Sequence, residues 1–382
     1  MSREAERSAS PRVLHLLRAL RVGGLENGVV NLVNGLTRAG LQCHVGCLIE
    51  RGEWMARVSP RGVWEGRLEQ TGRLRVVAGL RRYIRREGIE LLHSHNSQAH
   101  VFGAIASVLT GVPLVHTKHG QNWPDDPVWV RKSRQLSRFT RRIVPVSADI
   151  ARIVTDIEKV PARKVTTIVN GIDTEAFRPG VRGQESGVRR RLGIEAGAFV
   201  VGSVGRLAWE KNYELLVKAF AAVRRVAPES RLVLVGDGPY RERIAHAAEQ
   251  EGVASSCLMP GRQHNVADWL QTLDVFCLSS LTEGTSITLL EAGACGLPAV
   301  VTDVGGNAEV VQDGVTGLVT PAGDEAAFRR ALIALHGDAA RREAMGAAAR
   351  RRVAERYSVE RMVREYLAVY RDVMAETRKG RG

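Results

Sequence analysis

Two cations stand close together in the second half of the chain, in the segment Gly205-Arg206-Leu207-Ala208-Trp209-Glu210-Lys211-Asn212. Arg206 and Lys211 lie five residues apart, after an apolar run and before a helical pattern. An arginine fork and a lysine point charge both suit the concentrated negative charge of a diphosphate, and Glu210 could orient them. We interpret the segment as a clamp for a diphosphate leaving group that could replace a metal ion. Two solvated loop cations are the alternative.

A second constellation consists of two glutamates eight residues apart, Glu283 and Glu291, within LTEGTSITLLEAGACGLPAV at residues 281–300. We expect Glu283 to precede a helix and Glu291 to lie in its early turns. Amide groups near Thr285, Ser286 and Ile287 are then free for phosphate or sugar oxygens. The two carboxylates can accept hydrogen bonds from hydroxyl groups of sugar and ribose. Two surface glutamates are the alternative, which the apolar and small neighbours disfavour.

A glycine pair, Gly23-Gly24, follows the apolar run at residues 13–17 and precedes a helical pattern. Such a pair lets the backbone approach a phosphate or a sugar closely. An ordinary turn that binds nothing is the alternative.

Histidines offer the alternative of a metal site. His93, His95 and His116 form an H-x-H pattern with a third histidine, which resembles a set of metal ligands. The sequence contains no D-x-D motif, and the acidic pair Asp125-Asp126 is followed by a proline in a predicted loop. We therefore predict no bound metal, and no cofactor besides the substrate.

Apolar runs that alternate with amphipathic segments must position these residues. In the first half the runs occupy residues 13–17, 43–49, 90–93 and 114–117, and in the second half residues 199–204, 231–235, 256–259, 275–278 and 299–302. This alternation is typical of parallel sheets covered by helices, and it restarts after the aperiodic segment 174–190. We predict an α/β fold with two doubly wound domains, at 1–180 and 181–356, and a helix at 357–382 that packs back on the first.

Composition agrees with two globular domains, because 382 residues with 44% hydrophobic and 25% charged residues suffice for two ordinary cores. A net charge of +14 favours polyanions, and the basic segments Arg73–Arg86 and Arg131–Arg142 predict either interfacial faces or solvated helix surfaces. Five cysteines without C-x-x-C spacing, no secretory signal and no spanning segment predict a cytoplasmic protein.

Six motifs together are highly specific. They are Gly23-Gly24, His119-Gly120, Asn170-Gly171-Ile172-Asp173, Gly205-Arg206 with Glu210-Lys211-Asn212, Gly236-Asp237-Gly238-Pro239, and Glu283 with Glu291. On these motifs the sequence resembles, over nearly its whole length, the GT-B glycosyltransferases of the retaining family 4.

The resemblance assigns roles by position. It implies that Arg206 and Lys211 hold the donor diphosphate, that Glu291 holds the ribose, and that Glu283 touches the transferred sugar. His119 matches the family's histidine near the reacting centre, where its backbone or its imidazole could meet the sugar or assist the acceptor hydroxyl. A packed histidine is the alternative.

Two further positions can be compared with the family pattern. Gly261-Arg262 fits the turn that contacts the nucleobase through backbone atoms. Thr285-Ser286 differs from the aromatic-Gly or Pro pairing that is more usual after Glu-Gly in this family.

The implied reaction moves a hexose from a nucleoside diphosphate sugar to a hydroxyl of a glycan or lipid-linked acceptor, with retention at the anomeric carbon. No enzymatic nucleophile is agreed for the family, so positioning and leaving-group stabilisation are the expected contributions. The stretch GGLENGVVNLVNGL looks especially like sugar transferases of exopolysaccharide and exosortase-associated clusters. Bacterial glycan acceptors are commonly lipid-linked, which suggests a peripheral enzyme on the inner face of the cell membrane and no nucleic-acid partner.

Two rival functions remain at this point. A nucleotide-sugar epimerase would need acid and base residues around the sugar and no acceptor site, whereas the two glutamates and the paired cations favour transfer. A basic membrane-binding or nucleic-acid-binding protein would neither hydrolyse nor transfer any sugar nucleotide.

Overall fold

A computed structural model describes residues 11–120, 126–180 and 187–379 of the chain, and it divides into two compact units. Unit 1 comprises Met1–Gly171 together with Val359–Gly382, and unit 2 comprises Ile172–Ser358. Residues 181–186 of the predicted linker lie outside the described residues. Each unit is described by itself below.

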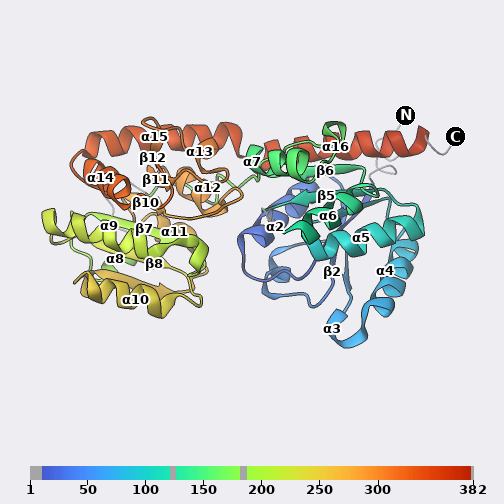
Figure 1. The fold of residues 1–382 in the computed structure, drawn as a ribbon, viewed down its shortest axis with the longest axis horizontal. Coiled ribbons are helices and arrows are strands. Elements are labelled where there is room, and N and C mark those ends of the chain that lie inside the picture. The colour runs from blue at the N-terminus through green and yellow to red at the C-terminus, as the bar shows by residue number, and fades with distance from the viewer. Residues whose placement is uncertain (1–10, 121–125, 181–186, 380–382) are drawn as a thin grey trace. The chain divides into compact units, whose positions relative to one another are not determined.

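Unit 1 is built on a six-stranded sheet with the order β3-β2-β1-β4-β5-β6, in which every pairing is parallel (Figure 1). The strands are β1 (Arg12–Leu17), β2 (Gln42–Cys47), β3 (Gly62–Glu65), β4 (Leu91–Ser94), β5 (Leu114–Lys118) and β6 (Arg142–Pro145). The strand order reverses direction at β1, which has β2 on one side and β4 on the other. Such a reversal is the point where doubly wound sheets bind ligands.

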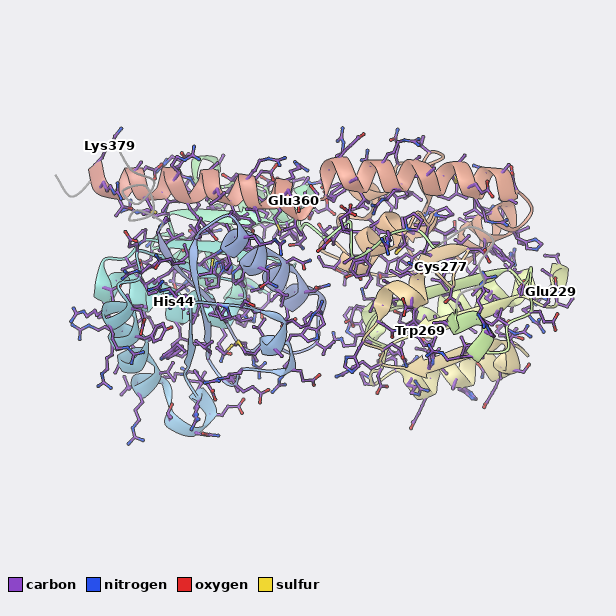
Figure 2. The ribbon with its side chains drawn as sticks, turned by 180° about the vertical axis from the view of Figure 1, so that it is seen from behind. His44, Glu229, Trp269, Cys277, Glu360 and Lys379 are labelled. Atoms are coloured by element: carbon purple, nitrogen blue, oxygen red, sulfur yellow. The ribbon has the colours of Figure 1, made fainter. Side chains whose placement is uncertain are left out.

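Helices connect these strands. They are α2 (Gly24–Arg38), η1 (Glu53–Arg57), α3 (Leu68–Thr71), α4 (Arg73–Glu87), α5 (Ser97–Thr110), α6 (Pro127–Ser137), α7 (Ala148–Arg152), η2 (Ile153–Ile157), η3 (Ala162–Lys164) and the C-terminal α16 (Val359–Lys379). Figure 2 labels both ends of α16, at Glu360 and Lys379.

The alternation of side chains along β1 divides the core of unit 1 into two layers. Val13 and Leu17 belong to the cluster that α2 and α16 cover, while Leu14 and Leu16 belong to the cluster under α4 and α5. His15 therefore points to the α2 and α16 face, because successive strand residues alternate between faces. This register decides which histidines meet inside the unit.

Gly35 allows α2 and α16 to approach closely. A Cβ atom at this position would lie 2.5 Å from the Cγ2 atom of Val363. Tyr366 and Tyr370 of α16 are buried in the same cluster. The C-terminal helix is thus a structural part of unit 1.

Unit 2 repeats the plan with a second six-stranded parallel sheet, in the order β12-β11-β10-β7-β8-β9. Its strands are β7 (Val200–Val204), β8 (Arg231–Val235), β9 (Cys257–Gly261), β10 (Val275–Leu278), β11 (Ala299–Thr302) and β12 (Gly317–Thr320). Its helices are α8 (Gly187–Arg191), η4 (Trp209–Lys211), α9 (Tyr213–Val226), α10 (Arg241–Gln250), η5 (Ala254–Ser256), α11 (Val266–Leu270), α12 (Ile287–Ala294), α13 (Asn307–Val310), α14 (Glu325–His336) and α15 (Ala339–Arg356).

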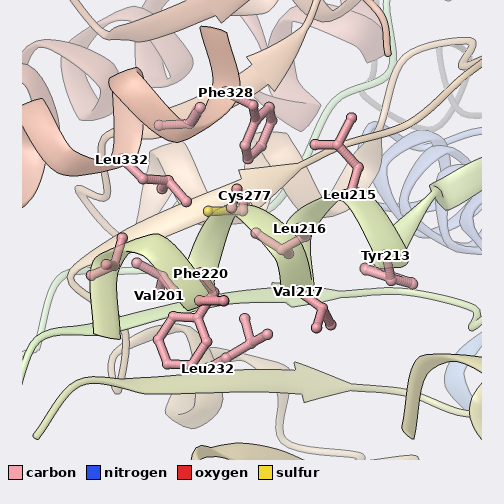
Figure 3. Close-up of a cluster of buried hydrophobic side chains, with 14 of the residues drawn as sticks. Val201, Tyr213, Leu215, Leu216, Val217, Phe220, Leu232, Cys277, Phe328 and Leu332 are labelled. Atoms are coloured by element: carbon pink, nitrogen blue, oxygen red, sulfur yellow. The ribbon is translucent and has the colours of Figure 1, made fainter. Parts of the chain in front are cut away.

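The largest core cluster of unit 2 joins the sheet to α9 and α14. Phe220 of α9 and Phe328 of α14 are fully buried around Cys277 of β10 (Figure 3). The predicted fold class, α/β with two doubly wound Rossmann-like domains, is confirmed by the two sheets. Within the described part of the chain, no helix is long and apolar enough to cross a membrane.

Candidate active site

The loop that follows β7 is held at the carboxyl edge of the unit 2 sheet. The amide of Gly205 donates to the carbonyl of Val235 at 2.9 Å, and the amide of Gly236 donates to the carbonyl of Gly261 at 3.0 Å. A Cβ atom on Gly236, whose φ is +143°, would lie 1.9 Å from the Gly205 carbonyl oxygen. The ends of β7, β8 and β9 therefore meet at one edge, where the sequence places the diphosphate clamp.

The two cations of the clamp have different partners. Arg206 pairs with Glu210, and its side chain stays 69% exposed. Lys211 pairs instead with Glu283, and both side chains are largely buried. Burial is the largest single influence on the pKa of Lys211 and lowers it, but Glu283, Tyr213 and Glu210 together outweigh burial and raise the pKa above its usual value. Glu210 thus orients Arg206, while a carboxylate from a different loop holds Lys211.

Two serines after β10 fix this ion pair. The hydroxyl of Ser280 donates to Glu283 at 2.7 Å, and that of Ser279 donates to the backbone carbonyl of Lys211 at 2.8 Å. Both serines are fully buried. Because β7 and β10 are neighbours in the sheet, the loops that follow them bring hydroxyl, carboxylate and ammonium groups together at one place.

A glycine with a left-handed backbone conformation contacts the backbone of the Glu283 loop. Gly305, in the loop after β11, has a φ of +55°, and a Cβ atom there would lie 2.2 Å from the carbonyl oxygen of Glu283. The amide of Gly306 donates to the carbonyl of Gly284 at 2.7 Å. The backbone around Glu283 is therefore set by close backbone contacts as well as by its side chain.

Helix α12 begins at Ile287, directly after the Glu283 loop. In the described structure the N-cap residue, Ser286, makes no side-chain capping bond, and the first amides of a helix have no intrahelical partner. Thr285 and Ser286 are buried, and Glu291 in the middle of the helix is only 3% exposed. A buried carboxylate of this kind is unlike the exposed surface glutamate considered as the alternative.

Arg262 directly follows β9, and its side chain is exposed. Its backbone therefore lies at the same edge of the sheet as Gly205 and Gly236. The predicted donor residues of unit 2 all lie in loops or helix starts at this edge, apart from Glu291, which lies within α12.

In unit 1, Gly23 leaves room for the end of a glutamate side chain. It is the N-cap of α2 with a φ of −176°, which any residue adopts, but a Cβ atom there would lie 2.3 Å from the Oε2 atom of Glu26. Gly24 has no atom within 4 Å of such a position among the described residues. Burial raises the pKa of Glu26. The Glu26 carboxyl thus lies beside Gly23, a feature that the glycine motif did not predict.

His119 lies at the end of β5, beside α2. A Cβ atom on Gly28 of α2 would be 3.1 Å from Oδ1 of Asn170 and 3.8 Å from Cε1 of His119. The glycine thus lets both side chains reach the helix. The Nε2 atom of His119 is 3.4 Å from Nδ1 of His95. Burial lowers the pKa of His119 to about 4, so the imidazole is neutral at pH 7.

The histidines that gather in unit 1 differ from the predicted metal set. The nitrogens that meet within 4.8 Å belong to His15, His93 and His95. The ring of His116 instead stacks on His100 at 3.8 Å between centroids, and its Nδ1 atom lies 2.9 Å from Ser94 Oγ.

His93 of this group has both nitrogens in hydrogen bonds, to Tyr370 at 2.6 Å and to Thr117 at 2.7 Å. One nitrogen of the neutral ring carries the proton, and the lone pair of the other is engaged in a hydrogen bond, so none is left for a metal in this arrangement. The donor chemistry of the group therefore fits a hydrogen-bonded core better than a set of metal ligands.

Family models match each half of the chain. The description "Glycosyltransferase Family 4" matches residues 22–176, and "Glycosyl transferases group 1" matches residues 186–352. Among solved structures, the Anabaena protein HepE in complex with UDP is similar with a TM-score of 0.83 and 22% identity, over 94% of this chain and 100% of HepE. The fold is that of the GT-B glycosyltransferases.

Curated relatives extend over most of the sequence. A "D-inositol 3-phosphate glycosyltransferase" of Kribbella flavida is 30% identical over 91% of this chain and 90% of its own length. An Escherichia coli "UDP-Gal:alpha-D-GlcNAc-diphosphoundecaprenol alpha-1,3-galactosyltransferase" is 28% identical over 69% and 71%, respectively. The chain therefore belongs to the family 4 glycosyltransferases.

Proposed function

We propose that this glycosyltransferase moves a hexose from a nucleoside diphosphate sugar to a hydroxyl of a glycan or lipid-linked acceptor, with retention at the anomeric carbon. The observation that carries the proposal is the buried pair of Lys211 and Glu283, fixed by Ser280. A donor diphosphate carries more negative charge than one carboxylate, so it can replace Glu283 as the ion-pair partner of the Lys211 ammonium group. Glu283 is then released to accept hydrogen bonds from the sugar hydroxyls.

The other residues complete the proposed donor site. Arg206, which is exposed and paired with Glu210, supplies a fork to the same diphosphate. Glu291 binds the ribose, and the amides at the start of α12 together with Thr285, Ser286 and Ile287 face phosphate or sugar oxygens. The backbone at Arg262 contacts the nucleobase. In unit 1, Gly23, Gly24 and His119 serve the sugar and the acceptor.

Relatives support the choice of substrates. The name of the Escherichia coli relative states a UDP-sugar donor and a diphosphoundecaprenol-linked acceptor, and the solved HepE structure contains UDP. The motif at residues 23–36 resembles transferases of exopolysaccharide clusters. These likenesses support our proposal that the reaction belongs to exopolysaccharide or cell-envelope glycan synthesis at the cytoplasmic face of the membrane.

Slow donor hydrolysis tests the reaction. Purified protein is incubated with a panel of nucleotide sugars, and the release of nucleoside diphosphate and free sugar is followed by chromatography and NMR. A transferase releases the diphosphate and a sugar whose first-formed anomer reports retention or inversion. An epimerase would return a changed sugar still attached to its nucleotide. No turnover of any donor would contradict both enzymatic readings.

Chelation tests metal independence. Arg206 and Lys211 supply the positive charge for the leaving group. We therefore expect EDTA, in large excess over trace metal, to leave the rate of donor hydrolysis unchanged within about twofold. Removal of metal ions would lower the rate only if a bound metal ion helped to stabilise the leaving diphosphate. Complete loss of activity that a divalent ion restores would contradict the proposal and return attention to the histidines of unit 1.

We also propose that unit 1 docks on an anionic lipid surface. On α4, Leu80 and Ile84 pack into the core whereas Leu74 is 87% exposed, so the outward face carries arginines and one exposed leucine. A groove of about 800 Å³ elsewhere on unit 1 combines charge with exposed apolar groups. It is lined by Val108, Phe139, Arg138, Arg141, Arg142, Arg163, Lys164 and Glu376, among other residues. The side chain of Phe139 is 53% exposed.

Vesicle co-sedimentation tests the docking. Each cation near an anionic surface contributes about 1 kcal/mol, so we expect Arg138→Gln, Arg141→Gln and Arg163→Gln together to weaken binding by about a hundredfold. The change of Arg81, Arg82, Arg85 and Arg86 to Gln tests α4 in the same way. Binding should also fall with rising salt. Equal pelleting with neutral vesicles, or no effect of either set, would contradict the proposal.

A further inference from the structure

Three imidazoles form a continuous chain in the interior of unit 1. The Nδ1 atom of His15 lies 3.0 Å from Nε2 of His95, and Nδ1 of His95 lies 3.4 Å from Nε2 of His119. His15 and His95 are at most 1% exposed. Among the described residues, the outer nitrogens of the chain, Nε2 of His15 and Nδ1 of His119, are buried without a hydrogen-bond partner.

The strand register creates this chain. His15 of β1 is paired with His93 of β4, and His95 follows the end of β4 on the same face. The ring of His93 lies 4.0 Å from that of His95, and Tyr370 and Thr117 hold it from both sides. His95 is therefore confined by a neighbour whose own orientation is fixed, and its two nitrogens remain directed at His15 and His119.

Proton counting makes the chain directional. Burial lowers the pKa of His15 to about 3 and that of His119 to about 4, and it lowers the pKa of His95 well below its usual value. Each ring is thus neutral at pH 7 and carries one N–H. Because His95 has one proton, it donates in one contact and accepts in the other. Both hydrogen bonds must point the same way, and the third proton sits at one end of the chain.

The two directions differ in what they leave unpaired. If the bonds point toward His15, its Nε2–H is a donor sealed in the core without a partner. If they point toward His119, His15 keeps only an unused lone pair, and the free N–H is at Nδ1 of His119. Either direction therefore leaves one buried N–H without a partner in the described structure, which is a rare and costly state unless a ligand supplies an acceptor. His119 as a residue is half-buried, although its Nδ1 atom is covered, whereas His15 is fully buried. Of the two ends, only that of His119 therefore borders the surface, where a substrate oxygen can supply the missing partner.

We propose that His15 and His95 are positioning residues that hold His119 as a neutral imidazole with its proton on Nδ1, so that it acts as a hydrogen-bond donor to a substrate oxygen and not as a general base. His15 donates to His95, and His95 donates to His119. Nε2 of His119 is then occupied as an acceptor, and Nδ1 has no lone pair with which to take the proton of an acceptor hydroxyl. This inference rests on the role of His119 proposed above, and it specifies the chemistry of that role.

The tautomer of His119 tests the chain without any substrate. In protein labelled with ¹⁵N-histidine, two-bond ¹H–¹⁵N correlations distinguish Nδ1–H from Nε2–H, and the signals of His119 are assigned by their absence in His119→Asn. We expect Nδ1–H in the unchanged protein. In His95→Phe, which removes both contacts at similar volume, we expect the Nε2–H form to increase at least about tenfold relative to Nδ1–H.

Matched variants separate the chain from general damage. His95→Asn keeps an N–H near the position of Nδ1 and should restore the Nδ1–H tautomer of His119. His44→Phe is the control, because His44 is a buried histidine of β2 that contacts Tyr83 at 2.9 Å outside the chain (Figure 2). If His95→Phe does not fold, His15→Leu removes the first donor and should shift the tautomer in the same direction.

Turnover provides the second measurement. We expect kcat for donor hydrolysis to fall roughly tenfold in His95→Phe and to recover in His95→Asn. An Nε2–H tautomer in the unchanged protein, or the same tautomer in His95→Phe and His15→Leu, would overturn the inference. A tautomer change without any change in turnover would support the chain and contradict the proposed role of His119 instead.

Discussion

Replacing Lys211 by alanine is expected to lower kcat roughly a hundredfold while the protein stays folded. Lys211 is the buried cation of the clamp, and its ammonium is held beside Glu283 where a leaving diphosphate would gather charge. Losing one preorganised charged contact in a site of this kind costs about 3 kcal/mol in the transition state. Single-turnover donor hydrolysis at saturating donor measures the effect directly.

Two controls keep this result interpretable. Lys218→Ala removes an exposed lysine of α9, which lies 3.9 Å from Glu325, and should leave the rate unchanged. Because Lys211→Ala leaves the Glu283 carboxylate buried without its cation, denaturant unfolding of Lys211→Ala measures the loss of stability separately from the loss of turnover. Wild-type turnover in Lys211→Ala would show that the clamp is misassigned.

Gly305→Ala should damage the same site through the backbone. The added Cβ atom would lie 2.2 Å from the carbonyl oxygen of Glu283, so the loop that carries this carboxylate must move. Strain of this size, together with a left-handed φ, should reduce the free energy of unfolding by about 3 kcal/mol. Denaturant unfolding measures the stability, and donor hydrolysis measures the displacement of Glu283.

Gly193→Ala is the matched control for this variant. Gly193 has a φ of +61°, close to the +55° of Gly305, and no described atom lies within 4 Å of the added Cβ position. Its loss of stability, about 1 kcal/mol, reports the cost of the left-handed conformation alone. Equal losses in the two variants would mean that the contact between Gly305 and Glu283 does not constrain the loop.

Much of the fold could be predicted because apolar runs and helical periodicity recur in order along both halves. The positions of the clamp and of Glu283 at strand ends followed from the same pattern. The partner of Lys211 did not. Glu210 is its neighbour in sequence, but Glu283, 72 residues away, takes the ion pair because β10 lies beside β7. A local sequence pattern does not contain the order of the strands in the sheet. Ion pairs between the loops of neighbouring strands could therefore not be predicted from it.

The histidine chain could not be predicted in full for the same reason. The H-x-H pattern marked His93 and His95 as chemically interesting, but His15 lies in another strand, and only the register of β1 against β4 brings it beside them. Glu26 is similar, because its carboxyl lies beside Gly23 after a turn of helix whose side-chain direction the glycine motif does not encode. A search for polar residues in otherwise apolar strands would have found His15.

The C-terminal helix α16 makes unit 1 discontinuous along the chain. All 187 residues of unit 2, Ile172–Ser358, are synthesised after the six strands of unit 1 and before the helix that closes its core. During translation, the apolar surface around Val13, Val33 and Leu36 therefore stays uncovered until Tyr366 and Tyr370 of α16 have been synthesised. Unit 2 is contiguous and can fold as it emerges. A nascent chain stalled within unit 2 would expose an unfinished core, which makes that interval the point at which a chaperone is most needed.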